Sequence, residues 1–159
     1  MIRVKIIALG KLKEDYLRLA VSEYEKRLKG YCSLEIAELS PKALNENPSA
    51  AEIEAALEKE ADMIIKALPK SSKVVAMCIE GKQYSSEELA GLLELSANDV
   101  GSITFIIGSS YGLAPRIKAM ADVKLSMSKM TFPHQIARML LLEQIYRCFK
   151  INEGSAYHK

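Results

Sequence analysis

The sequence predicts an α/β fold in which helices cover both faces of a mainly parallel sheet. Short runs rich in Ile and Val alternate with amphipathic helical patterns along almost the whole chain, which is typical of repeated strand–helix–strand units. The runs KVVAMCI and SITFII are nearly continuous in apolar residues, as expected for central strands covered on both faces. With 159 residues and no internal repeat or linker, the chain is expected to form a single domain over residues 1–159.

The first part of the chain contains two strand patterns and two helical patterns. The strand patterns are rich in β-branched residues, and the helical patterns place apolar side chains three or four positions apart. Gly30 and Pro69 are expected to end the two helices. A segment with two prolines and two asparagines is expected to be a loop. The expected elements are strands at 2–9 and 34–39, helices at 11–29 and 50–68, and a loop at 40–49.

The second part of the chain continues the alternation and ends in a long helix. Ser85 and Glu88 have the spacing of a capping box at the start of a helix. Thr131 is expected to cap the last helix, with Pro133 close to its first position. The expected elements are strands at 73–79, 102–107 and 123–127, loops at 80–84 and 126–132, and helices at 85–95, around 116–120 and through 136–149.

The last helix carries more apolar residues than one buried face requires. Residues 139–142 are four apolar residues in a row, and together they point almost all the way round a helix. Cover on more than one side is therefore expected, and in a chain of this length a partner subunit is the expected second cover. The residues after the helix, 152–159, are polar and are expected to pack little.

Composition is that of an ordinary globular protein, with 49% apolar and 26% charged residues. No apolar run approaches the roughly 20 residues of a membrane span, and the first residues lack the apolar core of a signal peptide. The three cysteines are widely spaced without a CxxC pair, and only two histidines are present. These features predict a reduced, cytoplasmic protein that has no metal site and does not bind membranes.

Charge is distributed unevenly along the chain. Residues 1–45 carry nine Lys and Arg against six Asp and Glu, and residues 46–100 carry five against eleven. Residues 101–159 carry eight against three, so the C-terminal third is the basic part. A nucleic-acid partner would be met from that side. The alternative is a solvated surface on which charge is unevenly distributed but which has no nucleic-acid partner.

Three expected strand ends carry residues that suit a ligand site. Ligands of parallel α/β sheets bind beyond the carboxyl ends of the strands. The turn from Gly108 to Gly112 fits neither GxGxxG nor GxxxxGK[ST] and has no lysine for a phosphate, so a non-phosphorylated group such as an adenosine moiety suits it better. A plain tight turn is the alternative. The three strand ends are 79–82, 108–112 and 126–132.

Few side chains have the pattern of a catalytic centre. His134 lies at the start of a helix, where a structural role is the simpler interpretation, whereas His158 lies in a basic tail, where function is as reasonable as structure. Glu143 and Arg147 are four residues apart and are expected to pair along the helix, with RNA contact by Arg147 as the alternative. No serine or cysteine has a neighbouring histidine and carboxylate, so a hydrolase triad has no support.

Four segments resemble the RlmH family of SPOUT-class methyltransferases. They are the opening IIALGKLKE, the turn IIGSSYGL, the run LSMSKMTFPHQIARMLLLEQIYRCFKI and the ending YHK. The resemblance covers essentially the whole chain. It implies a SPOUT-type, mainly parallel sheet with helices on both faces, a C-terminal trefoil knot and a homodimer. Such a knot departs from the general rule against threaded chains.

The resemblance also implies a reaction and a site. The reaction transfers a methyl group from S-adenosylmethionine to N3 of a pseudouridine in 23S rRNA of the assembled bacterial ribosome. Ser109 departs from the family, in which a second glycine is usual at this position; because serine is small, cofactor binding is expected to be kept. The implied cofactor-binding residues are Met77, Gly108, Met127, Ser128, Lys129, Met130, Thr131 and Phe132, and the implied catalytic residues are Arg147, Tyr157 and His158.

Chemical reasoning gives these last three residues provisional roles. A uracil-type imide nitrogen must lose its proton before it attacks the methyl group. Arg147 or His158 could stabilise the resulting anion, or a group of the tail could accept the proton. Tyr157 could stack on a base, and the tail of one subunit could complete the pocket of the other. Two other functions stay open: a non-catalytic α/β module that binds a nucleotide-like ligand, and, less favoured, a phosphate-binding enzyme.

Overall fold

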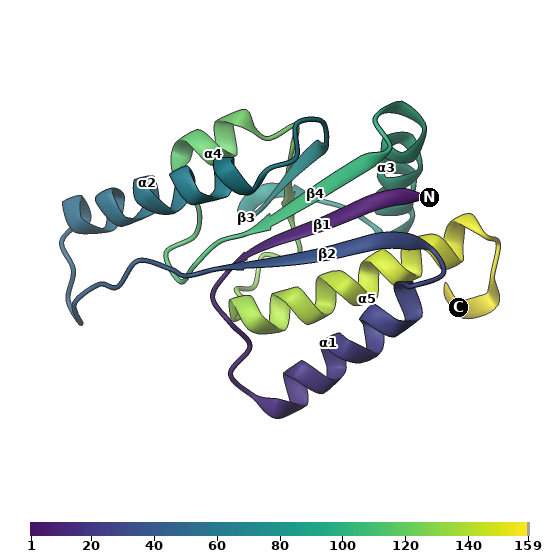
Figure 1. Ribbon diagram of the computed structural model, residues 1–159, viewed down its shortest axis with the longest axis horizontal. Helices are drawn as coiled ribbons and strands as arrows, with labels where there is room; N and C mark the ends of the chain where they lie inside the picture. Colours follow the sequence, from purple (N-terminus) through teal and green to yellow (C-terminus); the bar gives the residue numbers. More distant parts are fainter. Residues whose placement is uncertain (159) are drawn as a thin grey trace.

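Five parallel strands form one sheet in the computed structural model, which describes residues 1–158 (Figure 1). The strands are β1 (Ile2–Leu9), β2 (Cys32–Leu39), β3 (Lys73–Gln83), β4 (Ser102–Ile107) and β5 (Val123–Ser126). The helices are α1 (Asp15–Leu28), α2 (Ala50–Ala67), α3 (Ser86–Asp99), α4 (Pro115–Met120) and α5 (His134–Asn152), followed by a short 3-10 turn, η1 (Ala156–His158). The strand order is β2-β1-β4-β3-β5, and every pairing is parallel. The predicted parallel α/β sheet is confirmed.

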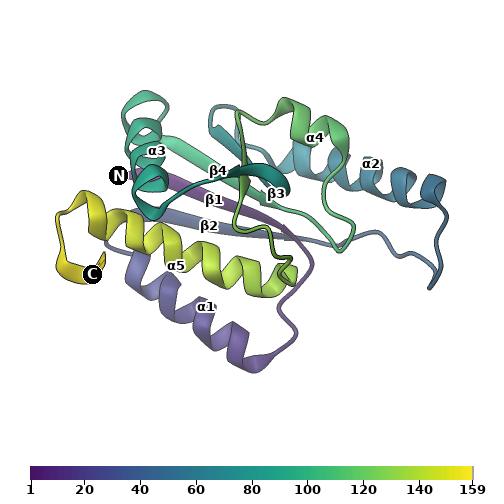
Figure 2. The same cartoon turned by 180° about the vertical axis from the view of Figure 1, so that it is seen from behind.

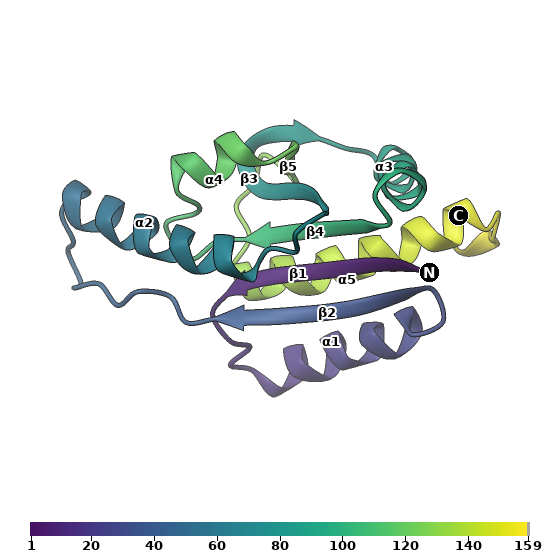
Figure 3. The ribbon, with the colours of Figure 1, turned by 45° about the horizontal axis from the view of Figure 1, so that its top comes forward.

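Helices cover both faces of this sheet, as predicted. Apolar residues of α1, α3 and α5 pack against one face, and those of α2 and α4 pack against the other (Figures 1 and 2). Strand β4 is buried along its whole length because it lies in the middle of the sheet, between β1 and β3 (Figure 3). None of the helices within residues 1–158 combines the length and the apolar character that crossing a membrane requires. The C-terminal trefoil knot stays a prediction.

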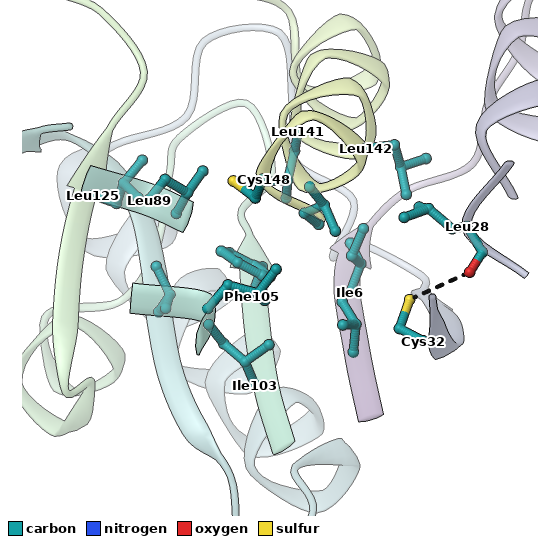
Figure 4. Close-up of a cluster of buried hydrophobic side chains, with 14 of the residues drawn as sticks. Ile6, Leu28, Cys32, Leu89, Ile103, Phe105, Leu125, Leu141, Leu142 and Cys148 are labelled. Carbon is teal, nitrogen blue, oxygen red and sulfur yellow. Dashed lines mark hydrogen bonds between the residues drawn. The ribbon is translucent and has the colours of Figure 1, made fainter. Parts of the chain in front are cut away.

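The larger core lies between the sheet and helices α1, α3 and α5. Phe105 and Ile103 of β4 face Leu141 and Cys148 of α5 in this core (Figure 4). Burial raises the pKa of the Cys148 thiol to about 12 and that of Cys32 to about 11. Both thiols therefore remain protonated near neutral pH and act as small apolar groups.

Strand β3 is longer than the sequence predicted. The polar residues after Ile79 were expected to form a loop at 80–84, but the strand continues to Gln83. Met77 pairs with Leu125 of β5, and after an irregular stretch Lys82 pairs with Leu125 again. The prediction was wrong because a bulge returns the chain to its neighbour, which a polar sequence does not reveal.

Helix α5 lies against the sheet and contacts both α1 and α3 (Figure 1). Its buried face consists of Arg138, Leu141, Leu142, Ile145 and Cys148. The expected cover on more than one side is thus supplied to a large extent by the chain itself. Apolar side chains such as Met139 and Leu140 stay half-buried, and the predicted homodimer remains a prediction.

Two details of helix and tail structure correct the sequence predictions, and a third confirms one. Thr131 does not cap α5: Pro133 holds the N-cap position, and no side chain bonds to the cap. Gly30 lies directly after the C-cap of α1, although outside the left-handed region, so the prediction that it ends this helix is confirmed. The tail packs more than expected, because the Tyr157 ring meets that of Tyr146 edge-on at 5.1 Å. Lys159 lies outside the described residues.

Gly81 gives a test of the contact between the bulge of β3 and β5. A Cβ added at Gly81 would lie 2.7 Å from backbone atoms of Lys124 and Leu125, which cannot move aside as a side chain would. Gly81→Ala is therefore expected to lower the free energy of unfolding by about 1–3 kcal/mol in chemical denaturation.

Gly91 in α3 serves as the matched control. A Cβ there meets no atom within 4 Å, and alanine favours the helix, so Gly91→Ala should raise the free energy of unfolding by about 0.4–1 kcal/mol. Equal effects of the two substitutions would contradict the close approach of Gly81 to β5.

Candidate functional site

Three neighbouring strands bring the implied cofactor-binding residues to the same end of the sheet. Met77 of β3 pairs with Ile107 of β4 on one side and with Leu125 of β5 on the other. Since all strands run in the same direction, Gly108 and Met127, which follow β4 and β5, lie on the same edge as Met77. The residues implied for cofactor binding, Met77, Gly108, Met127, Ser128, Lys129, Met130, Thr131 and Phe132, are called here the cofactor set.

The turn after β4 is tight and tolerates no side chain at its first position. A Cβ on Gly108 would lie 2.3 Å from the carbonyl oxygen of Gly112, so only glycine fits. Gly112 N donates to Ser109 O at 2.8 Å, and Gly112 has φ 82°. Ser109 is outside the left-handed region, and its hydroxyl donates to Glu60 at 2.8 Å. Serine is therefore compatible with the backbone of this turn.

The segment after β5 is shaped by its own serines. The Ser126 hydroxyl donates to the carbonyl oxygen of Ser128 at 2.9 Å, and the Ser128 hydroxyl accepts from Met130 N at 3.0 Å. Met130 is 72% exposed and Phe132 is 37% exposed, which leaves apolar surface at the edge of the sheet. Apolar side chains next to a turn that lacks large side chains are suited to bind an adenosine moiety.

A cavity of about 200 Å³ adjoins this edge on the α2 face of the sheet; we call it the α2 cavity. Ser109, Ser110 and Tyr111 line it from the turn after β4, and His134 lines it from the start of α5. Its remaining walls come mainly from α2 and the segment after β2. The α2 cavity thus lies beside both the turn and the loop of the cofactor set.

His134 is half-buried against the end of β1, where a Cβ on Gly10 would lie 3.4 Å from its Nε2. Burial lowers the pKa of the imidazole, and the positive charges of Arg138 and Lys13 lower it further. His134 is thus held neutral at physiological pH. Its position beside the α2 cavity favours a functional role for His134 over the structural role that the sequence suggested.

Arg138 is a polar residue of this region that the sequence analysis missed. Its side chain is only 2% exposed, and it donates to Glu38 at 2.6 Å and to the carbonyl oxygen of Gly10 at 2.8 Å. These bonds fix the start of α5 to the ends of β1 and β2. The available signal was a basic residue within the apolar part of the last helix pattern.

The residues implied as catalytic gather at the other end of α5. Arg147 donates to Glu143 at 2.6 Å, which confirms the predicted pair along the helix, and its guanidinium lies 4.9 Å from the centre of the Tyr157 ring. Hydrogen bonding to Glu143 raises the pKa of Arg147. His158 Nε2 lies 2.6 Å from a carboxylate oxygen of Glu87 in α3.

Within one chain, this second group lies far from the cofactor set. Arg147 follows His134 by thirteen positions in one continuous helix, a separation of roughly 20 Å at 1.5 Å per residue. Figure 1 shows α5 starting near the carboxyl ends of the strands and leading to the C-terminus at the opposite edge. The structure therefore brings together each group of residues but does not join the two groups within a subunit.

Metal ligands do not gather in this region. Across residues 1–158, no three His, Cys, Asp or Glu side chains are grouped so that they could hold a metal ion. Cys78, which follows Met77, is half-buried, and burial raises the pKa of its thiol.

The parallel sheet with helices on both faces and the tight turn after β4 define an α/β protein with a candidate ligand site at the carboxyl ends of its strands. A family model described as "Predicted SPOUT methyltransferase" matches residues 2–158. The chain belongs to the SPOUT methyltransferase family.

Relatives of known name narrow the comparison. The chain is 46% identical over 157 residues to the "Ribosomal RNA large subunit methyltransferase H" of Clostridioides difficile (strain 630), covering 98% of this chain and 99% of the relative. It is 45% identical over 158 residues to the protein of the same name from Streptococcus uberis, covering 99% of each. The resemblance to the RlmH family is thereby confirmed.

Solved structures share the fold at low sequence identity. The crystal structure of a "Probable Methyltransferase" from Bordetella pertussis Tohama I matches with a TM-score of 0.61 at 16% identity, covering 92% of this chain and 95% of that one. This likeness supports the fold alone.

The lowered pKa of His134 leads to a prediction about stability. As pH falls through the ordinary value of about 6.5, the unfolded chain takes up a proton that folded His134 does not, so stability decreases until the lower folded pKa is reached. His134→Gln should show a smaller loss of unfolding free energy between about pH 7.5 and pH 5.5. Identical losses in both proteins, measured by denaturant titration, would contradict the neutral imidazole.

Proposed function

We propose that this protein transfers a methyl group from S-adenosylmethionine to N3 of a pseudouridine in 23S rRNA of the assembled ribosome. The observation that carries the proposal is the strand register that places Met77, Gly108 and the segment after β5 on one edge of the sheet. The names of relatives 45–46% identical over nearly the whole chain support rRNA as the substrate. Work on ribosomes would place the protein in the cytoplasm.

The cofactor set would hold S-adenosylmethionine at this edge. The Gly108 turn would let backbone approach the adenosine, and Met130 and Phe132 would supply apolar contact. When bound, S-adenosylmethionine supplies a methyl group on a positively charged sulfur, which makes that carbon electrophilic. The residues of the cofactor set mainly have to fix the position of that methyl group relative to the nitrogen that receives it.

The residues at the end of α5 would act on the base. N3 of pseudouridine would give its proton to water and then form a bond to the methyl carbon as the carbon–sulfur bond breaks, with S-adenosylhomocysteine as the leaving product. The guanidinium of Arg147 would stabilise the developing negative charge on the base, and Tyr157 would stack against it. His158 could assist as a second cation or as a hydrogen-bond donor.

A homodimer is required for these two groups to meet. Because about 20 Å of helix separates them in one chain, the tail of one subunit would have to reach the cofactor set of its partner. A two-fold axis makes this arrangement reciprocal, so two composite sites form. Exposed apolar residues on α1, Tyr16 at 64% and Leu19 at 73%, together with half-buried Met139 and Leu140 of α5, provide surface for such a contact.

The direct test is transfer of labelled methyl from S-adenosylmethionine to assembled ribosomes, free large subunits and naked 23S rRNA from cells that lack this protein. Label on assembled ribosomes, mapped to N3 of one pseudouridine, is the expected result. Cofactor binding without transfer to any of the three would favour a non-catalytic binding module instead.

Removing the Arg147 guanidinium should separate turnover from cofactor binding. Arg147→Ala is expected to lower kcat about 10²–10³-fold, since a positive charge opposite the developing anion is lost. Affinity for S-adenosylmethionine, measured by calorimetry, should be nearly unchanged. Arg116→Ala is the matched control, because Arg116 pairs with Glu58 and Asp62 and none of these three residues lines the α2 cavity. Parallel loss of turnover and cofactor affinity in Arg147→Ala would contradict this division of roles.

Mixed dimers test the composite site. Gly108→Ala should abolish cofactor binding at its own turn, and Arg147→Ala should disable the partner's site. Each homodimer is expected to be nearly inactive, whereas a dimer with one subunit of each kind keeps one intact site. Activity that does not recover on mixing, in dimers verified by mass, would contradict a site shared between subunits.

A further inference from the structure

The α2 cavity contains a carboxylate that the proposed methyl transfer does not use. Glu60 is 3% exposed although it is charged, and it lines the cavity beside Ser109 and Ser110. A buried carboxylate in a cavity with mainly apolar walls is costly unless hydrogen bonds stabilise it. Because Glu60 lies next to the turn of the cofactor set, it is placed to contact a ligand that enters the cavity.

Two donors from the protein hold the Glu60 side chain in place. Oε1 accepts from the Ser109 hydroxyl at 2.8 Å, and Oε2 accepts from Lys42 N at 2.9 Å. A carboxylate offers about four lone-pair positions, so each oxygen keeps capacity for one more donor. Glu60 is thus a fixed acceptor at the wall of a cavity, available for an N–H group of a ligand.

Pseudouridine has an N–H group that uridine lacks. Its ring is joined to ribose through carbon, and N1–H therefore lies on the edge where uridine has only a C–H. N1 and N3 are separated by a single carbonyl carbon, so a base held through N1–H presents N3 in a different direction. A hydrogen-bond acceptor opposite N1 therefore recognises pseudouridine and leaves N3 free to react.

We propose that the α2 cavity receives the target base and that Glu60 accepts a hydrogen bond from N1–H of pseudouridine. This inference rests on the proposed function and adds to it the residue that distinguishes pseudouridine from uridine. The base enters beside Tyr111 and His134, two cavity-lining residues with aromatic rings on which a base can stack. N3 is then directed to the neighbouring cofactor set.

Size and charge around the cavity agree with this occupant. About 200 Å³ is ample space for a planar pyrimidine ring with its two carbonyl oxygens. Ile53 and Leu57 supply apolar walls for the faces of a ring. Lys42 is exposed beside the cavity, where its ammonium group can meet the phosphate of the target nucleotide.

The test compares two ribosome substrates that differ at one ring. One carries pseudouridine at the methylated position, and the other carries uridine there because its source lacks the enzyme that isomerises this nucleotide. Wild-type protein is expected to favour the pseudouridine ribosomes about tenfold to a hundredfold in kcat/KM, as loss of a hydrogen bond to a charged acceptor implies. Glu60→Met, which removes both acceptor oxygens, should lose most of this ratio, mainly through a lower kcat/KM on pseudouridine.

Ser109→Ala is the matched control for a purely structural role. It removes a donor to Glu60 but leaves the carboxylate, so kcat/KM should fall equally on both ribosomes and the ratio should persist. An unchanged ratio in Glu60→Met, or an equal collapse of the ratio in Ser109→Ala, would overturn the assignment.

Filling the cavity gives a second, independent measurement. Ala56 is 7% exposed and lines the cavity, so Ala56→Leu should occupy the space of the base and lower kcat/KM at least about tenfold while cofactor affinity and Tm persist. Wild-type rates in a folded Ala56→Leu protein would overturn the inference. If wild-type protein methylates neither ribosome, the proposed function itself fails; if it methylates both equally, only the role of Glu60 fails.

Discussion

The buried position of helix α5 constrains both ends of the candidate site. Contacts with α1 and α3 hold the helix on the sheet, and the ion pair from Arg138 to Glu38 fixes its start. Its length then sets where the aromatic and cationic side chains of the tail can be, at the amino edge of the sheet (Figure 1). A subunit can adjust neither end without disturbing the core, so the two groups of residues stay apart within one subunit.

Much of the fold follows from patterns that act locally. The strands at Ile2–Leu9 and Ser102–Ile107 were predicted with the bounds that the structure shows, because their apolar runs end at glycines. The capping box of α3 was also predicted, since Ser85 and Glu88 bond within one helical turn. The extension of β3 was not, because pairing of Lys82 with β5 depends on a strand about forty residues further along the chain. Long-range pairing leaves little trace in a polar segment.

The candidate site was harder to predict from the sequence than the fold. We could infer which strand ends carry candidate residues, but the alignment of Met77 with both Ile107 and Leu125 comes from the register of the sheet. Glu60 drew no attention because it lies in an acidic amphipathic helix, where glutamates are usually solvated. Only the tertiary structure shows that this one is buried against Ser109. The packing of the tail likewise depends on tyrosines that are distant in sequence.

The three cysteines differ in burial, and this has a practical consequence for experiments. With pKa values of about 11 and about 12, Cys32 and Cys148 expose very little thiolate at neutral pH, on the order of one part in 10⁴ or less. Cys78 is less buried and follows Met77 directly. Mild alkylation should therefore modify Cys78 first. This gives a single attachment point for a fluorophore beside the cofactor set, without prior removal of the other two thiols.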